Sequence, residues 1–202
     1  MSWRWRSPLA GVFGKHAEWC AVADSDIVED TGSDTAMTLG FCDLSPLPRL
    51  GAKGDTEKRV PNINHSAVMK TGSLCCRLSA DEFLLLAAPD GTAPELSEVL
   101  PKPRLLLPRR DSHCCLGLCG WRAPEMLSLL CAVAPPEKDE LLQTRVAEIG
   151  ALVIRDARTD VPAFNLLVDS GYAMHLWDAI RHAATARNGS VIGWRQWREL
   201  FS

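Results

Sequence analysis

Several sequence features that would point directly to a chemistry are missing from this chain of 202 residues. It contains no GxGxxG dinucleotide loop, no GxxxxGK(S/T) phosphate loop, no HExxH zinc motif and no GxSxG nucleophile elbow. The stretch GAKGD at Gly51 to Asp55 is therefore only a turn that contains a lysine. The sequence therefore gives no indication of a nucleotide-dependent enzyme, a metalloprotease or a serine hydrolase.

The chain also lacks a strong charge excess and a long hydrophobic run. Its net charge of -3 and pI near 6.0 provide no basic surface for phosphates, so we expect no nucleic-acid partner. The longest apolar runs, such as Phe83 to Ala88, are far shorter than the roughly 20 residues of a membrane span. The first residues, MSWRWRSPLAGVF, lack the long apolar core of a signal peptide. We therefore expect a cytoplasmic protein that has no membrane partner.

None of the eight cysteines belongs to a CxxC pair, the spacing that a zinc site favours. The stretch HCCLGLCG, from His113 to Gly120, alternates as a strand does, so its side chains point to opposite faces in turn. On a strand, Cys115 and Cys119 would lie about 13 Å apart, at roughly 3.3 Å per residue. Thiolates that share one zinc lie within about 4 Å of each other. We predict that these cysteines, and the neighbours Cys75 and Cys76, pack in the core.

The first half of the chain gives a mixed pattern. The acidic run from Asp24 to Asp34 indicates a solvated surface loop, because it lacks the spacing of a calcium-binding EF-hand loop. A short strand is expected around Met37 to Cys42. The apolar runs SLCCRL and EFLLLAA, separated by Ser79-Ala80-Asp81, predict a hairpin. Five prolines between Pro89 and Arg110 indicate the connection between two halves.

The second half predicts a β-α-β-β-α order. A strand at 113–120 precedes a helix over 123–133, two strands begin at Val146 and Ala163, and a helix follows over 170–186. This order matches a ferredoxin-like, split βαβ unit. We expect an α+β protein with an N-terminal part at 1–105, a ferredoxin-like part at 106–190 and a tail at 191–202.

A family resemblance lies in the same segments. QTRVAEIGALVIRD and PAFNLLVDSGYAMHLWDAI resemble the gamma subunit of heterotetrameric sarcosine oxidase, a relative of the aminomethyltransferase (glycine cleavage T-protein) fold. CDLSPLPRLGAKGD, GSLCCRLSADEFLLLA and LCGWRAPEMLSLLCAV resemble earlier elements of that family. The resemblance covers roughly residues 40 to 185, most strongly 143 to 182. It implies a T-protein-like α+β fold.

The resemblance also implies a role. It suggests an accessory gamma subunit of a flavoenzyme that demethylates sarcosine oxidatively to glycine, with formaldehyde or methylenetetrahydrofolate as the one-carbon product. Its partners would be alpha, beta and delta subunits, and FAD, FMN, NAD, tetrahydrofolate and zinc would be held on those subunits. No catalytic, cofactor-binding or metal-ligating residue carries over to this chain, which we expect to be inactive in isolation.

Three polar residues keep two interpretations each. His175, on the last predicted helix, is either a structural or interface histidine or a general base. Asp169 either caps that helix or faces a folate-like cavity. Lys53 is either a solvated turn lysine or the neutraliser of a carboxylate, such as that of a folate tail or a partner.

Tryptophan is the other unusual feature, with seven tryptophans against one tyrosine. Four lie near the ends of the chain and form a candidate subunit interface, because tryptophan and arginine are enriched at interface hot spots: Trp3, Trp5, Trp194 and Trp197. Removing residues 191–202 would then weaken assembly. The alternative is that these tails fold back on their own domain.

Two other functions stay open at this point. The chain could be the equivalent subunit of another N-methyl amino acid dehydrogenase, such as one that acts on N-methylglutamate. It could also be a free-standing, folate-binding regulatory protein of the T-protein superfamily. Folate binding by the isolated chain would favour the latter, whereas assays of the whole complex would separate the two oxidases.

Overall fold

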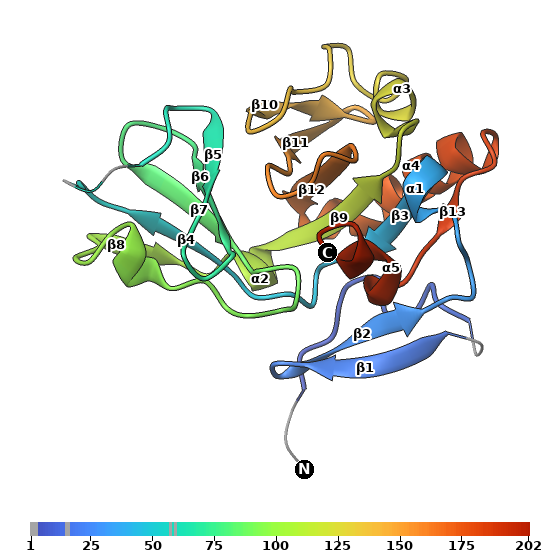
Figure 1. Ribbon diagram of the computed structural model, residues 1–202, viewed down its shortest axis with the longest axis horizontal. Coiled ribbons are helices and arrows are strands. Elements are labelled where there is room, and N and C mark those ends of the chain that lie inside the picture. The colour runs from blue at the N-terminus through green and yellow to red at the C-terminus, as the bar shows by residue number, and fades with distance from the viewer. Residues whose placement is uncertain (1–3, 15–16, 57, 59) are drawn as a thin grey trace.

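The computed structural model describes residues 4–14, 17–56, 58 and 60–202. Within these residues the strands form sheets of two, six and five strands (Figure 1). The strands are β1 (Glu18–Val22), β2 (Ser25–Asp30), β3 (Gly40–Asp43), β4 (Arg49–Lys53), β5 (His65–Val68), β6 (Leu74–Arg77), β7 (Glu82–Leu86), β8 (Leu105–Leu107), β9 (His113–Cys119), β10 (Leu141–Val146), β11 (Ile149–Arg155), β12 (Ala163–Asp169) and β13 (Ser190–Val191). The helices are α1 (Ala36–Leu39), α2 (Arg109–Ser112), α3 (Ala123–Leu127), α4 (Ala173–Thr185) and α5 (Trp194–Glu199), with single 3-10 turns at Leu96–Glu98 and Ser170–Tyr172.

The six-stranded sheet contains the predicted split βαβ unit. Its order is β10-β11-β12-β9-β3-β13, and every neighbouring pair is antiparallel except β13 with β3. The path β9, α3, β11, β12, α4, β13 follows the ferredoxin-like order, with β3 inserted beside β9 and β10 added at the far edge. The predicted α+β class is confirmed, as are the strand at 113–120, the strand from Ala163 and the helix within 170–186.

Two predicted elements of this unit differ in the structure. The run from Val146, predicted as one strand, starts at the turn of a β10–β11 hairpin, where Ala147 and Glu148 have φ values of 50° and 67°. Two successive residues with positive φ form the two-residue turn whose twist matches that of the flanking strands. Such turns usually contain Asn-Gly, so the sequence Ala-Glu gives no indication of one. The helix predicted over 123–133 ends at Leu127. The chain beyond it is extended at Cys131, which forms a β-bridge with Val146 and cannot be helical at the same time.

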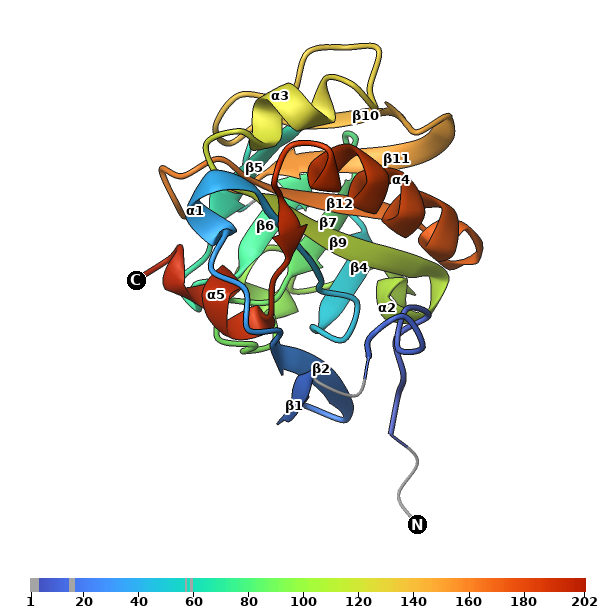
Figure 2. The ribbon, with the colours of Figure 1, turned by 90° about the vertical axis from the view of Figure 1, so that its right-hand side faces the viewer.

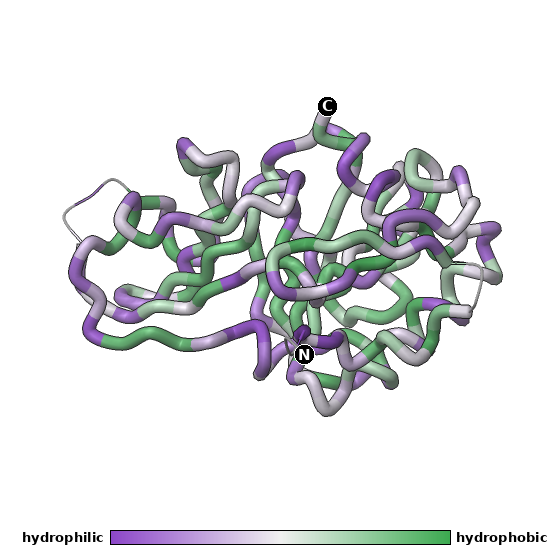
Figure 3. The backbone as a smooth tube through the Cα atoms, turned by 90° about the horizontal axis from the view of Figure 1, so that it is seen from below, coloured by the Kyte–Doolittle hydropathy of each residue, from purple (hydrophilic) through white to green (hydrophobic). Residues whose placement is uncertain are grey.

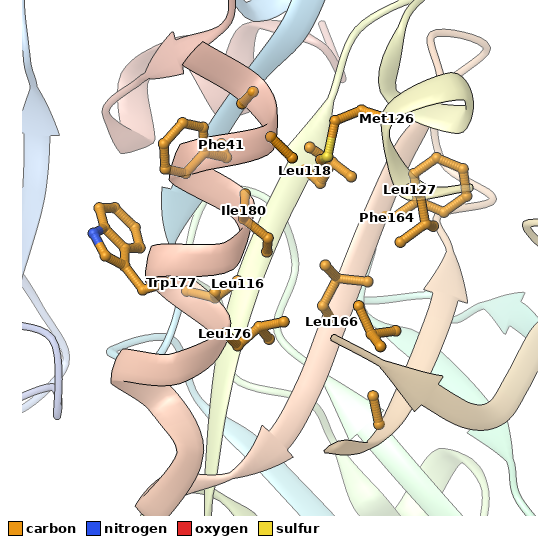
Figure 4. Close-up of a cluster of buried hydrophobic side chains, with 14 of the residues drawn as sticks. Phe41, Leu116, Leu118, Met126, Leu127, Phe164, Leu166, Leu176, Trp177 and Ile180 are labelled. Carbon is orange, nitrogen blue, oxygen red and sulfur yellow. The ribbon is translucent and has the colours of Figure 1, made fainter. Parts of the chain in front are cut away.

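One face of the six-stranded sheet is covered by α3 and α4. Figure 2 shows α4 lying across β9 and β12, and Figure 4 shows the side chains between them. Leu116 and Leu118 of β9 are fully buried there with Leu176 and Ile180 of α4 and Met126 of α3. Burying a side chain of this size contributes roughly 1.5–3 kcal/mol. This face holds the helices on the sheet.

The opposite face of β9 packs against the five-stranded sheet and α5. Cys115 and Cys119 are buried on this side in one cluster with Cys76 and with Trp197. A Cβ atom at Gly117 would lie 2.7 Å from Trp197 Cζ3, so the absent side chain leaves the space that the indole fills. The alternation of β9 and the prediction that its cysteines pack in the core are both confirmed.

The five-stranded sheet has the order β5-β6-β7-β4-β8 and is antiparallel throughout. The predicted hairpin of SLCCRL and EFLLLAA is present as β6 and β7, with Cys76 opposite Leu84. The connection predicted between Pro89 and Arg110 contains β8 and starts α2. One face of this sheet, including Phe83 and Leu85, forms a small core with Leu100.

The N-terminal region is more ordered than its sequence suggests. The run from Asp24 to Asp34, predicted as a solvated loop, contains β2, in which Ile27 and Val28 are buried. Its carboxylates are tolerated because α5 pairs with them: Arg198 lies 2.5 Å from Glu29. The strand predicted around Met37 to Cys42 begins instead as α1 and continues as β3.

A buried ion pair links the two larger sheets. Asp156, in the loop after β11, is fully buried and accepts from Arg158 at 2.7 Å and from Asn165 Nδ2 at 3.0 Å. Arg158 also donates to the carbonyl of Ala87 at 2.8 Å, just beyond β7. A buried charge persists only when it is paired and hydrogen-bonded, and this one is both.

The sheet pairing crosses the predicted boundary between residues 105 and 106. β3 lies between β9 and β13, so the six-stranded sheet takes strands from all three predicted parts. The predicted tail at 191–202 carries the buried helix α5 and is therefore part of the core. No helix in the described part of the chain is long and apolar enough to span a membrane.

Candidate functional site

A half-open cavity of about 360 Å³ lies where the two larger sheets meet. Residues of β7, β9, β11 and β12 supply its walls, together with the loop before β7. Its volume falls within the range of small-molecule sites, which are about 300–1,000 Å³. The apolar part of the lining is Leu78, Leu84, Gly150, Ala151, Leu152, Leu167 and Val168, and the polar part is Ser79, Glu82, Arg109, His113, Gln143 and Asp169.

Two charged groups of this cavity, Glu82 and Arg109, are already paired within the chain. Lys53 Nζ lies 2.8 Å from one carboxylate oxygen of Glu82, and Arg109 Nη2 lies 2.7 Å from the other. Gln143 donates to the carbonyl of Leu78 at 2.9 Å. These pairs hold β4, α2 and β10 around the cavity and use the polar groups that would otherwise recognise a ligand.

His113 stands at the start of β9 with its Nδ1 atom 2.7 Å from the hydroxyl of Ser112. Burial lowers its pKa below the ordinary 6.5, and the nearby cations Arg109 and Arg49 lower it further. The imidazole is therefore neutral at pH 7. It can donate or accept a hydrogen bond in the cavity without adding a charge.

Asp169 is the predicted cap and also lines the cavity. Its Oδ1 accepts from the backbone N–H of Gly171 at 2.9 Å, so the predicted cap is confirmed. The same side chain lines the cavity beside His113, because the two residues are directly opposite each other in the β9–β12 ladder. This pairing brings a carboxylate and a neutral imidazole together at one end of these two interior strands.

The other two polar candidates are accounted for by local contacts. Lys53 is a strand residue at the end of β4, and the carboxylate it neutralises is Glu82 of the same chain. His175 lies outside the cavity lining, with Nε2 2.9 Å from the carbonyl oxygen of Ala147 at the hairpin turn. The sequence therefore offered a cavity position for Asp169 as one of two interpretations, and it missed Glu82, Arg109 and His113.

The candidate interface tryptophans divide into three cases. Trp194 and Trp197 are only 5% and 1% exposed, so they are core side chains of this chain and not free surface. This corrects the expectation that they face a partner; the alternative, that the tail folds back, holds. Trp5 is partly exposed, donating to Asp111 at 2.8 Å beneath the guanidinium of Arg110. Trp3 lies outside the described residues.

Seven of the eight cysteines are buried, and Cys20 is half-buried. Within the described residues no three histidine, cysteine or acidic side chains gather in an arrangement that could hold a metal ion. Burial raises the pKa of the Cys115 thiol to about 11 and that of Cys119 to about 12. These thiols are protonated at pH 7, and a protonated, buried thiol is a poor nucleophile.

Comparisons with known proteins place the fold. No family model and no curated protein sequence matches the chain. Its structure is similar to the glycine cleavage system aminomethyltransferase T from Bartonella henselae, with a TM-score of 0.72 and 14% identity over 97% of this chain and 61% of that one. It is also similar to a chain of heterotetrameric sarcosine oxidase from Corynebacterium sp. U-96, solved in complex with pyrrole 2-carboxylate, with a TM-score of 0.61 and 14% identity over 98% of this chain and 96% of that one.

The two likenesses differ in extent. This chain spans 61% of the length of the aminomethyltransferase chain but 96% of the sarcosine oxidase chain. Identity of 14% in both comparisons is too low to transfer an activity. The protein has the α+β fold shared by aminomethyltransferase T and this chain of heterotetrameric sarcosine oxidase.

Proposed function

We propose that the protein is an accessory subunit of a heterotetrameric oxidase of the sarcosine oxidase type. The observation that carries this proposal is the match over 96% of a sarcosine oxidase chain, against 61% of aminomethyltransferase T. A chain that corresponds to a whole subunit of such a complex is expected to share its place in the assembly.

The paired state of the cavity supports an accessory role. Glu82, Arg109 and Gln143 are bound to groups of the same chain, and His113 and Asp169 are left as the polar groups with remaining capacity. In this proposal the alpha, beta and delta partners carry FAD, FMN, NAD, tetrahydrofolate and zinc. The complex oxidises sarcosine to glycine, or another N-methyl amino acid such as N-methylglutamate, while this chain serves assembly.

A second candidate is a free-standing folate-binding protein, and the cavity beside Asp169 favours it. A carboxylate next to apolar walls can accept hydrogen bonds from the ring nitrogens of a pterin that packs on Leu84 or Leu167. The cavity volume of about 360 Å³ is sufficient for a ring system. This candidate requires no partner chain.

Purification of the tagged chain from its native cells separates the two candidates. We expect larger partners and flavin absorbance to co-purify, with the flavin bleached on addition of sarcosine or N-methylglutamate. An unrelated tagged protein from the same cells is the control. A lone, colourless chain would contradict the accessory role.

For such a lone chain, calorimetric titration with tetrahydrofolate tests the second candidate. Binding should then weaken in Asp169→Asn, which removes the charge but keeps an oxygen for the N–H of Gly171. Unchanged binding in that variant would place the folate elsewhere.

A further inference from the structure

The N-terminal segment, residues 4–9, is attached to the outside of α2. Trp5 donates from its indole N–H to Asp111 at 2.8 Å, and the guanidinium of Arg110 lies 4.9 Å from the centroid of the Trp5 ring. Arg110 also donates to both carboxylate oxygens of Asp24 in the β1–β2 turn, at 2.5 and 2.8 Å. Figure 2 shows the segment beside α2, and Figure 3, seen from below, shows hydrophilic chain around the N-terminal end. The start of the chain therefore holds α2 from one side.

A second contact of the segment is buried. The hydroxyl of Ser7 donates to the carboxylate of Asp43 at the end of β3, and each residue is only 7% exposed. Ser7 also accepts from the N–H of Leu9 at 3.0 Å, and the side chain of Leu9 is fully buried in the core that α4 covers. The segment is thus anchored in the molecule at one end and attached to α2 at the other.

Hydrogen bonds continue from Asp43 to the cavity. The N–H of Ser45 donates to Asp43 at 2.9 Å, and the carbonyl of Ser45 accepts from Arg49 at 2.9 Å. Arg49 also donates to the carbonyl of His113. Because His113 lines the cavity, a continuous series of hydrogen bonds connects the N-terminal segment to the cavity wall.

Arg49 ties α2 to the same network. Its guanidinium is buried, and it donates to the carbonyls of Arg109 and Arg110 at 3.2 Å each as well as to that of His113. Burying a charge is costly unless its hydrogen bonds are kept, so Arg49 must follow any displacement of these carbonyls. The side chain of Arg109 in turn pairs with Glu82 in the cavity. α2 and the start of β9 therefore respond together to a change on either side.

We infer that the N-terminal segment controls the polar wall of the cavity, because its attachment to α2 sets the position of Arg109 and His113. The outer contact is exposed, with the side chains of Arg110 and Asp24 20% and 63% exposed. Exposed ion pairs contribute little to stability, so this end of the segment can detach while its anchor stays buried.

The coupling acts in both directions. A partner chain that contacts Trp5 changes the cavity, and a ligand in the cavity changes the N-terminal segment by the same free energy. The inference goes beyond the proposed function, because the coupling lies within this chain and holds for the accessory subunit and for the free-standing protein alike.

NMR of the full chain tests the coupling in two variants. Trp5→Phe removes the indole donor but keeps an aromatic ring, and Ser7→Ala removes the hydroxyl that binds Asp43. In each variant we expect the imidazole signals of His113 to shift, while those of His182 stay. We also expect the N–H of His113, which donates to the carbonyl of Arg109, to exchange with D2O about tenfold faster, because each variant removes a hydrogen bond to a carboxylate.

Arg4→Ala is the matched control within the same segment. Arg4 forms an exposed ion pair with Asp26 at 2.7 Å, and this pair leads to β2 and not to α2. We expect both His113 readouts to be the same as in the unchanged chain. Circular dichroism of each variant establishes that it is folded, so that a shifted signal reports on the position of His113 and not on unfolding.

A double-mutant cycle tests the path through Arg49. Arg49→Lys keeps the charge but lacks the planar set of donors that binds five carbonyls. Adding Ser7→Ala to Arg49→Lys should therefore shift His113 by less than Ser7→Ala does alone. If Arg49→Lys does not fold, the single variants Trp5→Phe and Ser7→Ala still decide the inference.

Two outcomes would overturn the inference: His113 readouts that stay unchanged in both Trp5→Phe and Ser7→Ala, or changes of equal size in Arg4→Ala. Full additivity in the cycle would refute the path through Arg49. The native purification described above reports on the accessory role separately, because it does not depend on the position of His113.

Discussion

Single residues explain how the two larger sheets are held together. Asp156 is a fully buried carboxylate that holds Arg158, and Arg158 in turn reaches the carbonyl of Ala87 beside the other sheet. A sequence cannot identify such a pair, because Asp156-Ala157-Arg158 looks like any polar turn between two strands. Burial, which only the packed fold defines, turns it into a connection between the sheets.

Removing one member of this pair should therefore be costly. We expect Asp156→Ala to lower the free energy of unfolding by about 3–5 kcal/mol, because it leaves the charge of Arg158 buried without a carboxylate partner. Asp178→Ala, which breaks the exposed pair with Arg181, should change it by less than about 1 kcal/mol. Urea unfolding followed by circular dichroism measures both, and equal losses would contradict the role given to Asp156.

His113 allows a second test, based on pH. Its pKa in the folded chain lies below the ordinary 6.5 because of burial and nearby cations. As the pH falls through about 6.5, the unfolded chain takes up a proton that the folded chain resists, so stability falls. We expect the imidazole signal in NMR to titrate at lower pH in the folded chain than in urea. Coincident titrations would show that His113 is solvated.

At the scale of elements, the sequence predicted those with a regular pattern and missed those set by tertiary contacts. The alternation in β9 and the apolar spacing in α4 identify these elements correctly. The β10–β11 turn was missed because Ala147 and Glu148 are unusual residues for positive φ. β2 was missed because its acidic residues are compensated by α5, which lies more than 160 residues away in the chain.

The C-terminal helix α5 is the element whose role changes most. Trp197 is 1% exposed and fills the space above Gly117. We expect Trp197→Ala to cost about 3–5 kcal/mol in unfolding free energy, measured by thermal or urea denaturation. Trp121→Ala should cost less than about 0.5 kcal/mol, because Trp121 is 61% exposed. A stable Trp197→Ala chain that loses only its partners would restore the interface interpretation.

The candidate cavity could be predicted only in part. Asp169 was recognised because it precedes a helix, where an acidic residue has a local reason to be. Arg109 and His113 are close in the chain, but Glu82 on β7 and Asp169 on β12 come from separate segments, and only the packed sheets bring all four together. Their individual sequence surroundings resemble those of ordinary surface residues.

At the scale of the whole molecule, the fold is one interlocked unit. The cluster that includes Trp197 contains residues of both larger sheets, and β3 connects the N-terminal half to the second half. The boundary predicted at residue 105 was based on proline content. Proline content does not indicate which strands pair, so it could not show that strands before and after residue 105 share one sheet.

A fragment of residues 106–190 should therefore fail to fold. Without β3, β9 loses the neighbour on one side, and β13, of which the fragment keeps Ser190 alone, loses the strand with which it pairs. We expect narrow amide dispersion in NMR and no cooperative thermal transition, in contrast to the full chain. A well-dispersed spectrum from this fragment would support the boundary at residue 105.

The position of β3 also sets an order of events during synthesis. β3 pairs with β13 at residues 190 and 191, so the sheet cannot close until the ribosome has made about 150 further residues. At about 5–20 residues per second, this takes on the order of ten seconds. For that time β3 has an unsatisfied edge, and Gly117, once it is made, lacks the indole of Trp197 until about 80 further residues follow. The nascent chain thus has a period in which a chaperone can bind the surface that its own C-terminal helix later covers.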